Sequence, residues 1–356
     1  MNKATQTADF SLGFSADLIR PDGQAVFGNV ADDFLAAYPH IRTGWMDAHR
    51  AEIGADQLGP FHAVIIGGGK VTPQSLSDSE NLLAVSRMGV GYDAVDVQAC
   101  TEANVLVTIT AGAVDRPMAE GTITWMLALS HNLRIKDRLV RTGQWEQRSM
   151  LHGHDLRGHT LGCVGLGRIA LKLLDLLRGF GMNEPIAHDP YLKPEDAQAH
   201  GVKLVDLDEL MEQADFVSIH CPSTPETRNL IGAHQIGLMQ PTAYLINTAR
   251  GGIIDEEALY DALKEGRIAG AALDCFAEEP LREPHRFREF DNVIMAPHCI
   301  GWTHEMFRDM AVMACQSMVD LSRGKEPHGM VNPEVLNRPA FISKWQRLQV
   351  NGGGHE

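Results

Sequence analysis

The chain has 356 residues, enough for two domains that each bury a sizeable core. Its 31 Lys and Arg against 46 Asp and Glu give a net charge of -15, which argues against nucleic acid or an anionic membrane surface as a partner. There is no apolar run near the roughly 18 residues of a membrane span, and the opening MNKATQTADF lacks the apolar stretch of a secretory signal. The six cysteines form no CxxC pair, so we expect reduced thiols in a cytoplasmic protein.

In the first hundred or so residues, short β-branched runs alternate with helical segments, a pattern typical of α/β architecture with parallel sheets. Strands are predicted at residues 62–66, 83–86 and 105–109. The sequence Gly67-Gly68-Gly69-Lys70 follows the first of them but lacks the GxxxxGK[ST] spacing of a phosphate-binding loop, so we interpret it as a turn.

From residue 117 to about 141 the apolar spacing predicts one long helix, ended near Gly143. The loop at 148–157 that follows contains His152 and His154, which could be interpreted as a metal-binding pair. Because neither an acid nor a cysteine stands at a suitable ligand spacing, we predict a solvated loop and no metal. Contact of this loop with a polar or phosphorylated substrate is the lesser alternative.

Residues 160–189 carry the most informative pattern: a buried strand at 160–164, a glycine turn, a helix and a second strand. Gly165 and Gly167 let the backbone turn tightly and approach a pyrophosphate, whose charge is stabilised at the amino end of the following helix. Ala170 occupies the third glycine position, where only close packing of helix on strand is needed. With strand, helix and second strand in order, the pattern predicts a dinucleotide site rather than a bare turn.

Asp189 ends the second strand, nineteen residues after Ala170. A carboxylate at this position accepts hydrogen bonds from an adenosine ribose. It would repel a 2′-phosphate, and His188-Asp189-Pro190-Tyr191 contains no arginine to bind one. The predicted cofactor is therefore NAD rather than NADP.

Further strands are predicted at 216–220, 243–247, 269–273 and 293–296, and a last helix from about 303 to 321. Polar residues follow three of these strands: Arg250 beside two glycines, Glu278-Glu279 before a proline, and His298. Each alone fits an ordinary surface turn or loop. Ligands of open α/β sheets, however, bind at the carboxyl ends of the strands, so the three together are candidates for a site.

These segments, taken together, resemble the D-isomer-specific 2-hydroxyacid dehydrogenase family, which includes phosphoglycerate, glyoxylate and hydroxypyruvate dehydrogenases. The matching stretches are VGLGRIA with Asp189, SIHCPSTPETRNLI, LINTARGGIIDEEAL, AGAALDCFAEEP and NVIMAPHCIG, in the family's order across residues 160–301. A looser match covers MGVGYDAVD at 88–96 and the helix from Met118.

The resemblance implies an α/β fold of two Rossmann-like domains with doubly wound parallel sheets and an active site in the interdomain cleft. Residues 1–116, completed by 300–340, would bind substrate, residues 117–299 would bind NAD, and 341–356 would be a tail, disordered over 351–356. The helix from Met118 and the following arm would form a homodimer interface. The partner would be a small 2-hydroxy or 2-oxo acid, with neither nucleic acid nor membrane.

The same resemblance implies that Arg250, Glu279 and His298 form the catalytic group. Arg250 would bind the substrate carboxylate and polarise the C2 oxygen, and His298 would exchange the proton with that oxygen. Glu279 would accept a hydrogen bond from the other imidazole nitrogen, which fixes the tautomer and favours the protonated ring.

Other positions are implied as contacts. Val90 and Gly91 would hold the substrate carboxylate together with Arg250 and His298. The cofactor-binding positions would be Gly165, Gly167, Arg168, Ile169, Asp189, Cys221, Thr248, Ala249, Asp274 and Gly301.

The chain departs from the family at two places. It has Ile109-Thr110-Ala111-Gly112 where Asn-Thr-Pro is frequent, and Trp302 where smaller residues are usual. Trp302 either narrows the substrate pocket or packs against the last helix, and we predict packing. The alternative function, from another class, is a dehydrogenase-like NAD(H)-sensing corepressor or binding protein.

Overall fold

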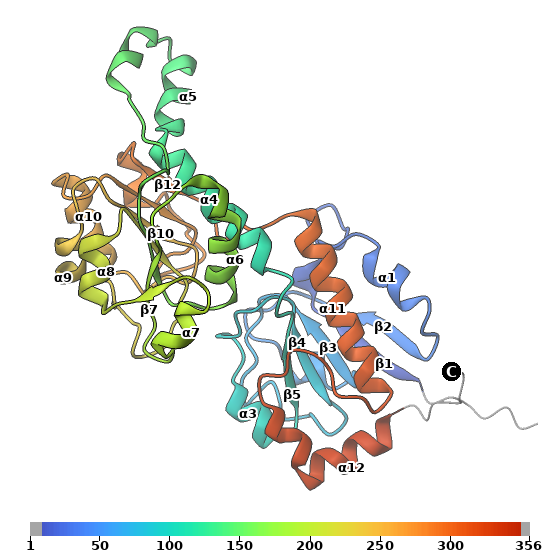
Figure 1. Cartoon of the computed structure of the whole chain (residues 1–356). Coiled ribbons are helices and arrows are strands. Elements are labelled where there is room, and N and C mark those ends of the chain that lie inside the picture. Colours follow the sequence, from blue (N-terminus) through green and yellow to red (C-terminus); the bar gives the residue numbers. More distant parts are fainter. Residues whose placement is uncertain (1–8, 350–356) are drawn as a thin grey trace, which may run out of the picture. The chain divides into compact units, whose positions relative to one another are not determined.

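A computed structural model describes residues 9–349 of the chain (Figure 1). The chain divides into two compact units: unit 1, residues 1–114 with 303–356, and unit 2, residues 115–302. The boundaries expected from the sequence, after residues 116 and 299, lie two and three residues from these. Every helix in the described part of the chain is too short or too polar to span a membrane.

Unit 1 contains a sheet of five parallel strands in the order β2-β1-β3-β4-β5. The strands are β1 (Phe10–Phe14), β2 (Ile41–Trp45), β3 (Ala63–Ile66), β4 (Ala84–Arg87) and β5 (Leu106–Ile109). The 3-10 turn η1 (Ala16–Leu18) follows β1, and three short helices lie in the connections: α1 (Val30–Leu35), α2 (Ala55–Leu58) and α3 (Val97–Glu102). The strands β3, β4 and β5 confirm the sequence prediction, since their apolar runs are buried on both faces of the sheet.

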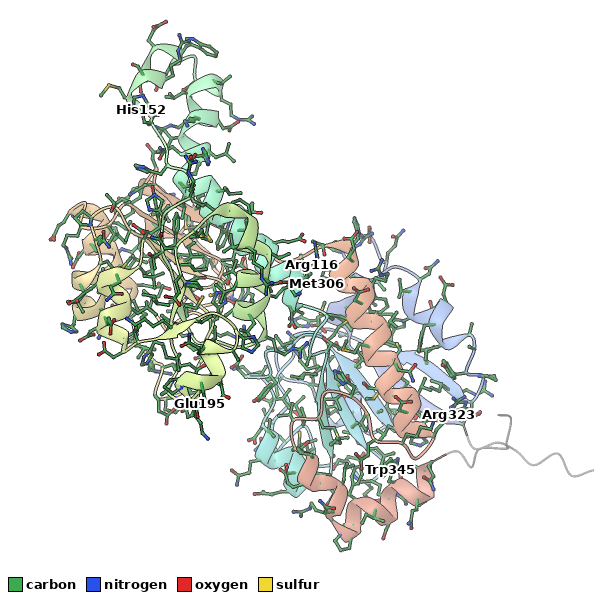
Figure 2. The ribbon with its side chains drawn as sticks, in the orientation of Figure 1. Arg116, His152, Glu195, Met306, Arg323 and Trp345 are labelled. Carbon is green, nitrogen blue, oxygen red and sulfur yellow. The ribbon has the colours of Figure 1, made fainter. Side chains whose placement is uncertain are left out.

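The end of the chain returns to unit 1 as α11 (His304–Ser322), η5 (Pro333–Asn337) and α12 (Pro339–Leu348). The prediction of a tail from residue 341 is wrong for α12, because this helix is anchored by specific side chains. Phe341 is fully buried, and the Trp345 indole N–H donates to the Leu321 carbonyl at 2.7 Å (Figure 2). The Lys344 ammonium donates to the carbonyls of Ser79, Leu82 and Ala103, while burial lowers the pKa of Lys344 to about 8. The predicted disorder of 351–356 lies outside the described residues.

Unit 2 contains a sheet of seven parallel strands in the order β12-β11-β10-β9-β6-β7-β8. The strands are β6 (Leu161–Val164), β7 (Ile186–His188), β8 (Lys203–Leu204), β9 (Phe216–Ile219), β10 (Tyr244–Asn247), β11 (Gly270–Leu273) and β12 (Val293–Met295). Chain order reverses between β6 and β9, the switch point at which doubly wound sheets bind ligands. The predicted α/β class with two Rossmann-like, doubly wound parallel sheets is confirmed.

Helices cover both faces of this sheet, and the four central strands β6, β9, β10 and β11 are buried along their whole length. The helices are α4 (Asp115–Ser130), α5 (Leu133–Arg141), α6 (Arg168–Leu177), α7 (Pro194–Gln198), α8 (Leu207–Gln213), α9 (Ala233–Leu238) and α10 (Glu256–Lys264), with 3-10 turns η2 (Trp145–Met150), η3 (Arg178–Phe180) and η4 (Arg286–Glu289). One apolar cluster lies around α8, α9 and α10, and another around α4 and α6.

The single long helix predicted from 117 to 141 is wrong, because the structure divides it into α4 and α5. Asn132 adopts the left-handed conformation at φ 51°, which asparagine tolerates better than most residues. Its side-chain amide donates to the His152 carbonyl, and the His154 N–H donates to the Ser130 carbonyl. These bonds tie the returning loop to the break and leave α5 and η2 as an arm that projects from unit 2 (Figure 1).

Candidate active site

The predicted site residues of unit 2 lie at one edge of its sheet, because all seven strands are parallel. Gly165 follows β6, Asp189 follows β7 and Cys221 follows β9. Thr248 follows β10 and Asp274 follows β11, while His298 follows β12. The topology thus gathers residues more than a hundred positions apart at the edge where α/β sheets bind ligands.

The glycine turn after β6 has the geometry that a dinucleotide needs. Gly165 has φ +92°, and a Cβ there would lie 2.8 Å from the Cys221 backbone nitrogen, so only glycine fits. Among the described residues, nothing lies within 4 Å of a Cβ built at Gly167, which caps α6. Open space at the amino end of a ten-residue helix fits a pyrophosphate, with Arg168 and Ile169 in the first turn.

Asp189 connects the second strand to this turn. One of its carboxylate oxygens accepts from the Leu166 N–H and the other from the Tyr191 N–H, each at 3.0 Å. Each oxygen retains further capacity to accept hydrogen bonds. Asp189, the acid expected to bind the ribose, therefore also stabilises the conformation of the glycine turn.

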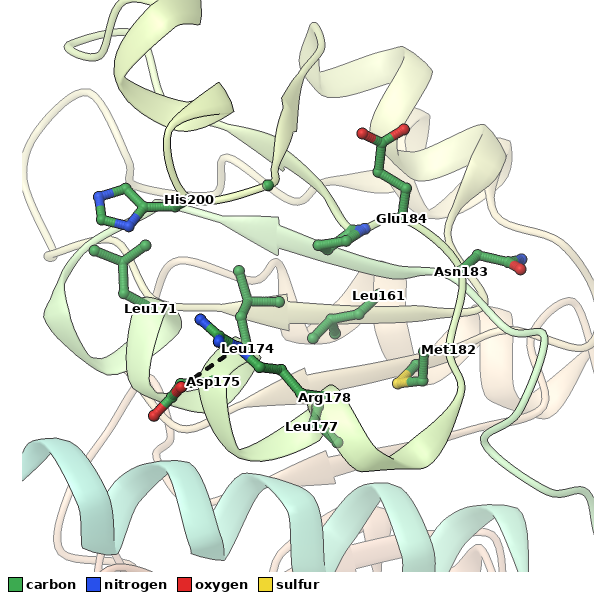
Figure 3. A pocket seen from close by; sticks show the side chains of 12 residues that line it. Leu161, Leu171, Leu174, Asp175, Leu177, Arg178, Met182, Asn183, Glu184 and His200 are labelled. Atoms are coloured by element: carbon green, nitrogen blue, oxygen red, sulfur yellow. Dashed lines mark ion pairs between the residues drawn. The ribbon is translucent and has the colours of Figure 1, made fainter.

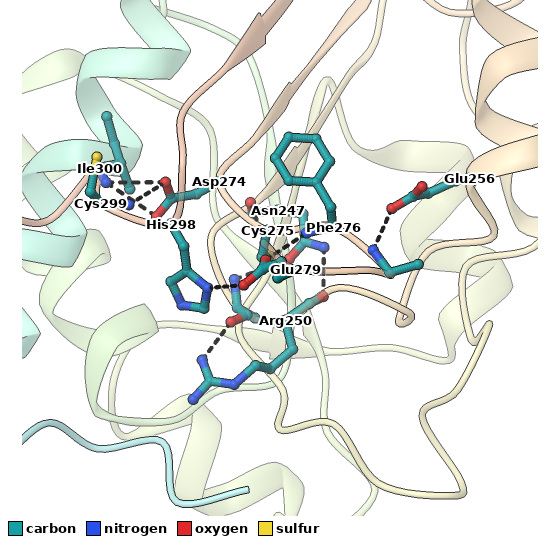
Figure 4. Close-up of polar contacts among 12 residues, drawn as sticks. Asn247, Arg250, Glu256, Asp274, Cys275, Phe276, Glu279, His298, Cys299 and Ile300 are labelled. Atoms are coloured by element: carbon teal, nitrogen blue, oxygen red, sulfur yellow. Dashed lines mark hydrogen bonds and ion pairs between the residues drawn. The ribbon is translucent and has the colours of Figure 1, made fainter. Parts of the chain in front are cut away.

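The turn after β10 presents Arg250 through the buried side chain of Asn247 (Figure 4). The Asn247 amide donates to the Arg250 carbonyl at 2.8 Å, and its oxygen accepts from the Ala249 N–H at 3.0 Å. A side chain at Gly251 would collide with the Phe276 carbonyl. Thr248 is buried, with its hydroxyl 3.5 Å from that of Thr122 on α4.

His298 and Glu279 are in direct contact. His298 Nδ1 lies 2.8 Å from one Glu279 oxygen, and the other oxygen accepts from the Phe276 N–H at 2.8 Å (Figure 4). Burial alone would raise the pKa of Glu279, but the hydrogen bonds from His298 and Phe276 and the charges of His298 and Arg250 outweigh it and lower the pKa. The ionised carboxylate requires Nδ1 to be the donor, which leaves Nε2 to handle a proton.

Asp274 anchors the loop that carries His298. It is 2% exposed, and its carboxylate accepts from the N–H groups of Cys299 (2.7 Å) and Ile300 (3.1 Å). Burial raises the pKa of Asp274, and these backbone bonds offset only part of that effect. His298 itself has φ 54°, a left-handed conformation that needs support from its surroundings.

Helix α4 braces the same loop from the other side. A Cβ at Gly121 would lie 3.1 Å from the Ile300 carbonyl oxygen, and one at Gly301 would collide with the Met118 sulfur. Gly301 is therefore where the loop packs on the helix. Trp302 ends the loop with 61% of its surface exposed, and its packing against the last helix stays a prediction.

Val90 and Gly91 belong to unit 1, in the loop after β4. The preceding Gly89 has φ +142°, and its N–H donates to the buried Thr110 hydroxyl at 2.9 Å. The Thr110 N–H in turn donates to the Gly89 carbonyl at 3.0 Å. The departure from the family pattern at 109–112 thus supplies a residue that fixes this glycine-containing loop.

A hollow of about 440 Å³ lies elsewhere on unit 2 (Figure 3). It is lined by leucines of α6 and by residues such as Leu161 and Pro185, which stand at the amino ends of β6 and β7. It is therefore at the opposite edge from His298. His152 lies in the loop that returns from the arm (Figure 2), and residues 9–349 contain no group of three His, Cys, Asp or Glu that could hold a metal ion.

Sequence reasoning did not single out Asn247, Thr110 or Asp115. Asn247 and Thr110 shape loops through buried hydrogen bonds, and Asp115 pairs with Arg168 at 2.9 Å. A polar residue at or just after the end of a buried strand was the available signal for Asn247 and Thr110. The partner of Asp115 is 53 residues away, and the sequence holds no local signal for it.

The sequence of this chain is similar to known proteins. Residues 123–299 match the family model described as D-isomer specific 2-hydroxyacid dehydrogenase, NAD binding domain. The D-3-phosphoglycerate dehydrogenase of Methanocaldococcus jannaschii is 41% identical over 270 residues, which are 76% of this chain but 51% of that protein. The chain therefore spans about half the length of that relative.

A glyoxylate reductase of Thermofilum pendens is 39% identical over 272 residues, 75% of this chain and 80% of that protein. Among solved structures, a glyoxylate reductase from Paecilomyes thermophila superposes with a TM-score of 0.78 at 25% identity, covering 92% of this chain and 99% of that one. The NAD-binding domain match agrees with the glycine turn and Asp189, and NAD is the cofactor. The chain belongs to the D-isomer specific 2-hydroxyacid dehydrogenase family and is an NAD-dependent oxidoreductase.

Proposed function

We propose that this protein interconverts a short D-2-hydroxy acid and its 2-oxo acid, with Arg250, Glu279 and His298 as the catalytic group. The observation that carries the proposal is the 2.8 Å contact between His298 and an ionised Glu279, beside the turn that presents Arg250. When NAD(H) is bound, its nicotinamide would supply or accept the hydride at C2.

His298 handles the proton. Because Nδ1 donates to Glu279, Nε2 is the nitrogen that gives a proton to the C2 oxygen during reduction and removes it during oxidation. Glu279 stays ionised at neutral pH, since its pKa is lowered, and so stabilises the imidazolium form. Asp274 and helix α4 hold the loop that carries the ring.

Arg250 supplies the positive charge for the substrate. Its planar guanidinium can bind a carboxylate with two parallel hydrogen bonds and can stabilise negative charge on the C2 oxygen. Val90 and Gly91 are proposed to add backbone N–H groups for the substrate carboxylate. Gly165, Gly167, Ile169, Asp189, Cys221, Thr248, Ala249 and Asp274 are proposed to line the cofactor.

The substrate we favour is glyoxylate or a close homologue. Relatives named glyoxylate reductase match 75% of this chain at 39% and 40% identity and are themselves covered to 80% and 82%. The relatives named D-3-phosphoglycerate dehydrogenase match 76% and 84% of this chain at 41% and 36% identity, and a solved glyoxylate reductase superposes over 92% of this chain with a TM-score of 0.78. Phosphoglycerate is the second candidate.

The test is NADH consumption by the purified protein with a panel of 2-oxo acids: glyoxylate, hydroxypyruvate, phosphohydroxypyruvate and pyruvate. We expect the highest kcat/KM with glyoxylate. Turnover of phosphohydroxypyruvate alone would move the protein to the second candidate. NADH binding without turnover of any member would favour the corepressor alternative, which the reductases and dehydrogenases among the relatives do not favour.

We further propose a homodimer formed through α4 and the arm. Four large apolar side chains of the arm are more than half exposed: Leu133, Val140, Trp145 and Met150. Such a set on one projecting segment is typical of an interaction site. Sedimentation equilibrium should give twice the chain mass, and the double variant Trp145→Ser with Met150→Ser should give the mass of a monomer.

All six cysteines are free thiols, which supports a cytoplasmic location.

A further inference from the structure

An ion pair outside the catalytic group joins the first turn of α4 to the glycine turn. Asp115 Oδ2 accepts a hydrogen bond from Arg168 Nε at 2.9 Å, and one terminal nitrogen of the guanidinium forms an ion pair with the same oxygen at 2.9 Å. Arg168 directly follows Gly167 and begins α6. The Asp115 side chain is only 11% exposed, whereas that of Arg168 is 69% exposed.

This difference in exposure indicates that Asp115 holds Arg168 in place, and not the reverse. Asp115 is fixed, because it begins a helix of sixteen residues that packs along α6. Arg168 is a long side chain that would otherwise sample many rotamers in solvent. Asp115 uses the side edge of the guanidinium, formed by Nε and one terminal nitrogen, so the end edge with both terminal nitrogens points away from it.

We propose that Asp115 is a positioning residue, which holds Arg168 at the glycine turn so that the end edge of its guanidinium meets the diphosphate of the dinucleotide. The inference rests on the proposed role of the glycine turn and deepens it. The arginine is ordered before the ligand arrives, so binding does not have to order it. The gain in binding affinity is therefore expected only for ligands that carry a diphosphate.

A second ion pair on the same helix provides a matched control. Arg116 and Glu120 are paired at 2.7 Å, but both side chains are about half or more exposed. Exposed pairs of this kind contribute little to stability. Glu120→Ala therefore removes one acid and one ion pair from α4 without touching Arg168.

The experiment is calorimetric titration of the full chain with ADP-ribose, which has the diphosphate, and with adenosine, which lacks it. Asp115→Ala should weaken ADP-ribose binding about three- to tenfold, the scale for ordering one long side chain, and leave adenosine binding unchanged. Asp115→Asn keeps the size and one acceptor oxygen, so its loss should be smaller. Glu120→Ala should change neither affinity.

The double variant decides whether Asp115 acts through Arg168. Arg168→Ala should weaken ADP-ribose binding, and adding Asp115→Ala to it should have no further effect. Independent losses, equal losses for adenosine, or tighter ADP-ribose binding by Asp115→Asn would overturn the inference; the last would mean that Asp115 only neutralises Arg168. If the wild-type chain binds ADP-ribose no better than adenosine, the proposed role of the glycine turn itself fails.

Discussion

The two sheets share a parallel, doubly wound design but differ in what occupies the loops at their switch points. In unit 1 the order reverses between β1 and β3, where the Gly67 N–H donates to the Ser15 hydroxyl at 2.9 Å and the Gly68 N–H donates to the Asp17 carboxylate. In unit 2 it reverses between β6 and β9, where Gly167 faces open space within the described part of the chain.

This difference explains why equal topology does not give equal function. In unit 1 the protein's own acid takes the place that an anion would occupy, and no helix begins directly after Gly67-Gly68-Gly69. In unit 2 the turn leads straight into α6, whose positive end is available to a ligand. Function therefore depends on the loops at the strand ends rather than on the fold.

Removal of the proposed acid–base group of unit 2 should have a large effect on catalysis. His298→Ala should lower turnover by roughly 10²–10⁴-fold, the usual scale for a positioned proton donor. NADH affinity, measured by fluorescence, should change little. The control is His234→Ala, which removes a histidine paired with a carboxylate, Asp208, at 3.0 Å on the helices of the same unit. A fully active His298→Ala protein would show that the proton passes elsewhere.

The next largest effect is expected at Arg250. Arg250→Lys keeps the charge but loses the planar fork, so transition-state stabilisation should fall by about 2–4 kcal/mol. The steady-state kcat/KM for the 2-oxo acid measures this loss. Arg267→Lys, at an arginine paired with Glu265, should be silent. Near-native efficiency in Arg250→Lys would assign the arginine a structural role.

Sequence alone predicted the parts of the fold that follow from local pattern. The strands β3–β5 and β9–β12 are mainly apolar runs, which are recognisable because strands buried in a parallel sheet contain few polar residues. The strand β2 carries exposed Arg42 and Thr43, and β8 has two residues, so neither has such a run. The missed helix α12 depends on Lys344, whose acceptors lie more than 240 residues away.

The candidate site, like the fold, contains residues that local sequence pattern predicts and contacts that it does not. Arg250, Glu279 and His298 stand beside strand ends or within recognisable motifs, so they could be named in advance. Their supporting contacts could not be predicted, because these bonds join distant segments. Asp274, expected at the cofactor, binds N–H groups 25 and 26 residues away, and Asp115, which was not predicted, binds Arg168. The helix break at Asn132 likewise depends on a bond to His152.

A glycine substitution in each unit tests whether the two switch-point turns differ as described. Gly165→Ala forces alanine to φ +92° against Cys221, which should cost about 1–3 kcal/mol of unfolding free energy and abolish tight NADH binding. Gly68→Ala keeps the N–H that Asp17 accepts, and its Cβ meets that carboxylate at an ordinary 3.5 Å. Its unfolding free energy should change by about 0.5 kcal/mol or less. Urea unfolding and NADH titration measure both, and equal effects would remove the distinction between the two turns.

The smallest expected effect is a change in pH dependence at Glu279. The hydrogen bonds from His298 and Phe276, with the nearby positive charges, outweigh burial and lower the pKa of Glu279, so its charge is present at neutral pH and is lost only in acid. Reduction needs a proton on His298 and should therefore slow as pH rises, while oxidation should accelerate over the same range. Glu279→Gln preserves size but removes the negative charge beside the imidazole, so both limbs should move to lower pH. The measurement is kcat/KM against pH in both directions, with Glu256→Gln, which faces His285 at 3.3 Å, as the matched control. If the limbs of the pH profile do not move in Glu279→Gln, the carboxylate orients the imidazole ring without changing its affinity for a proton.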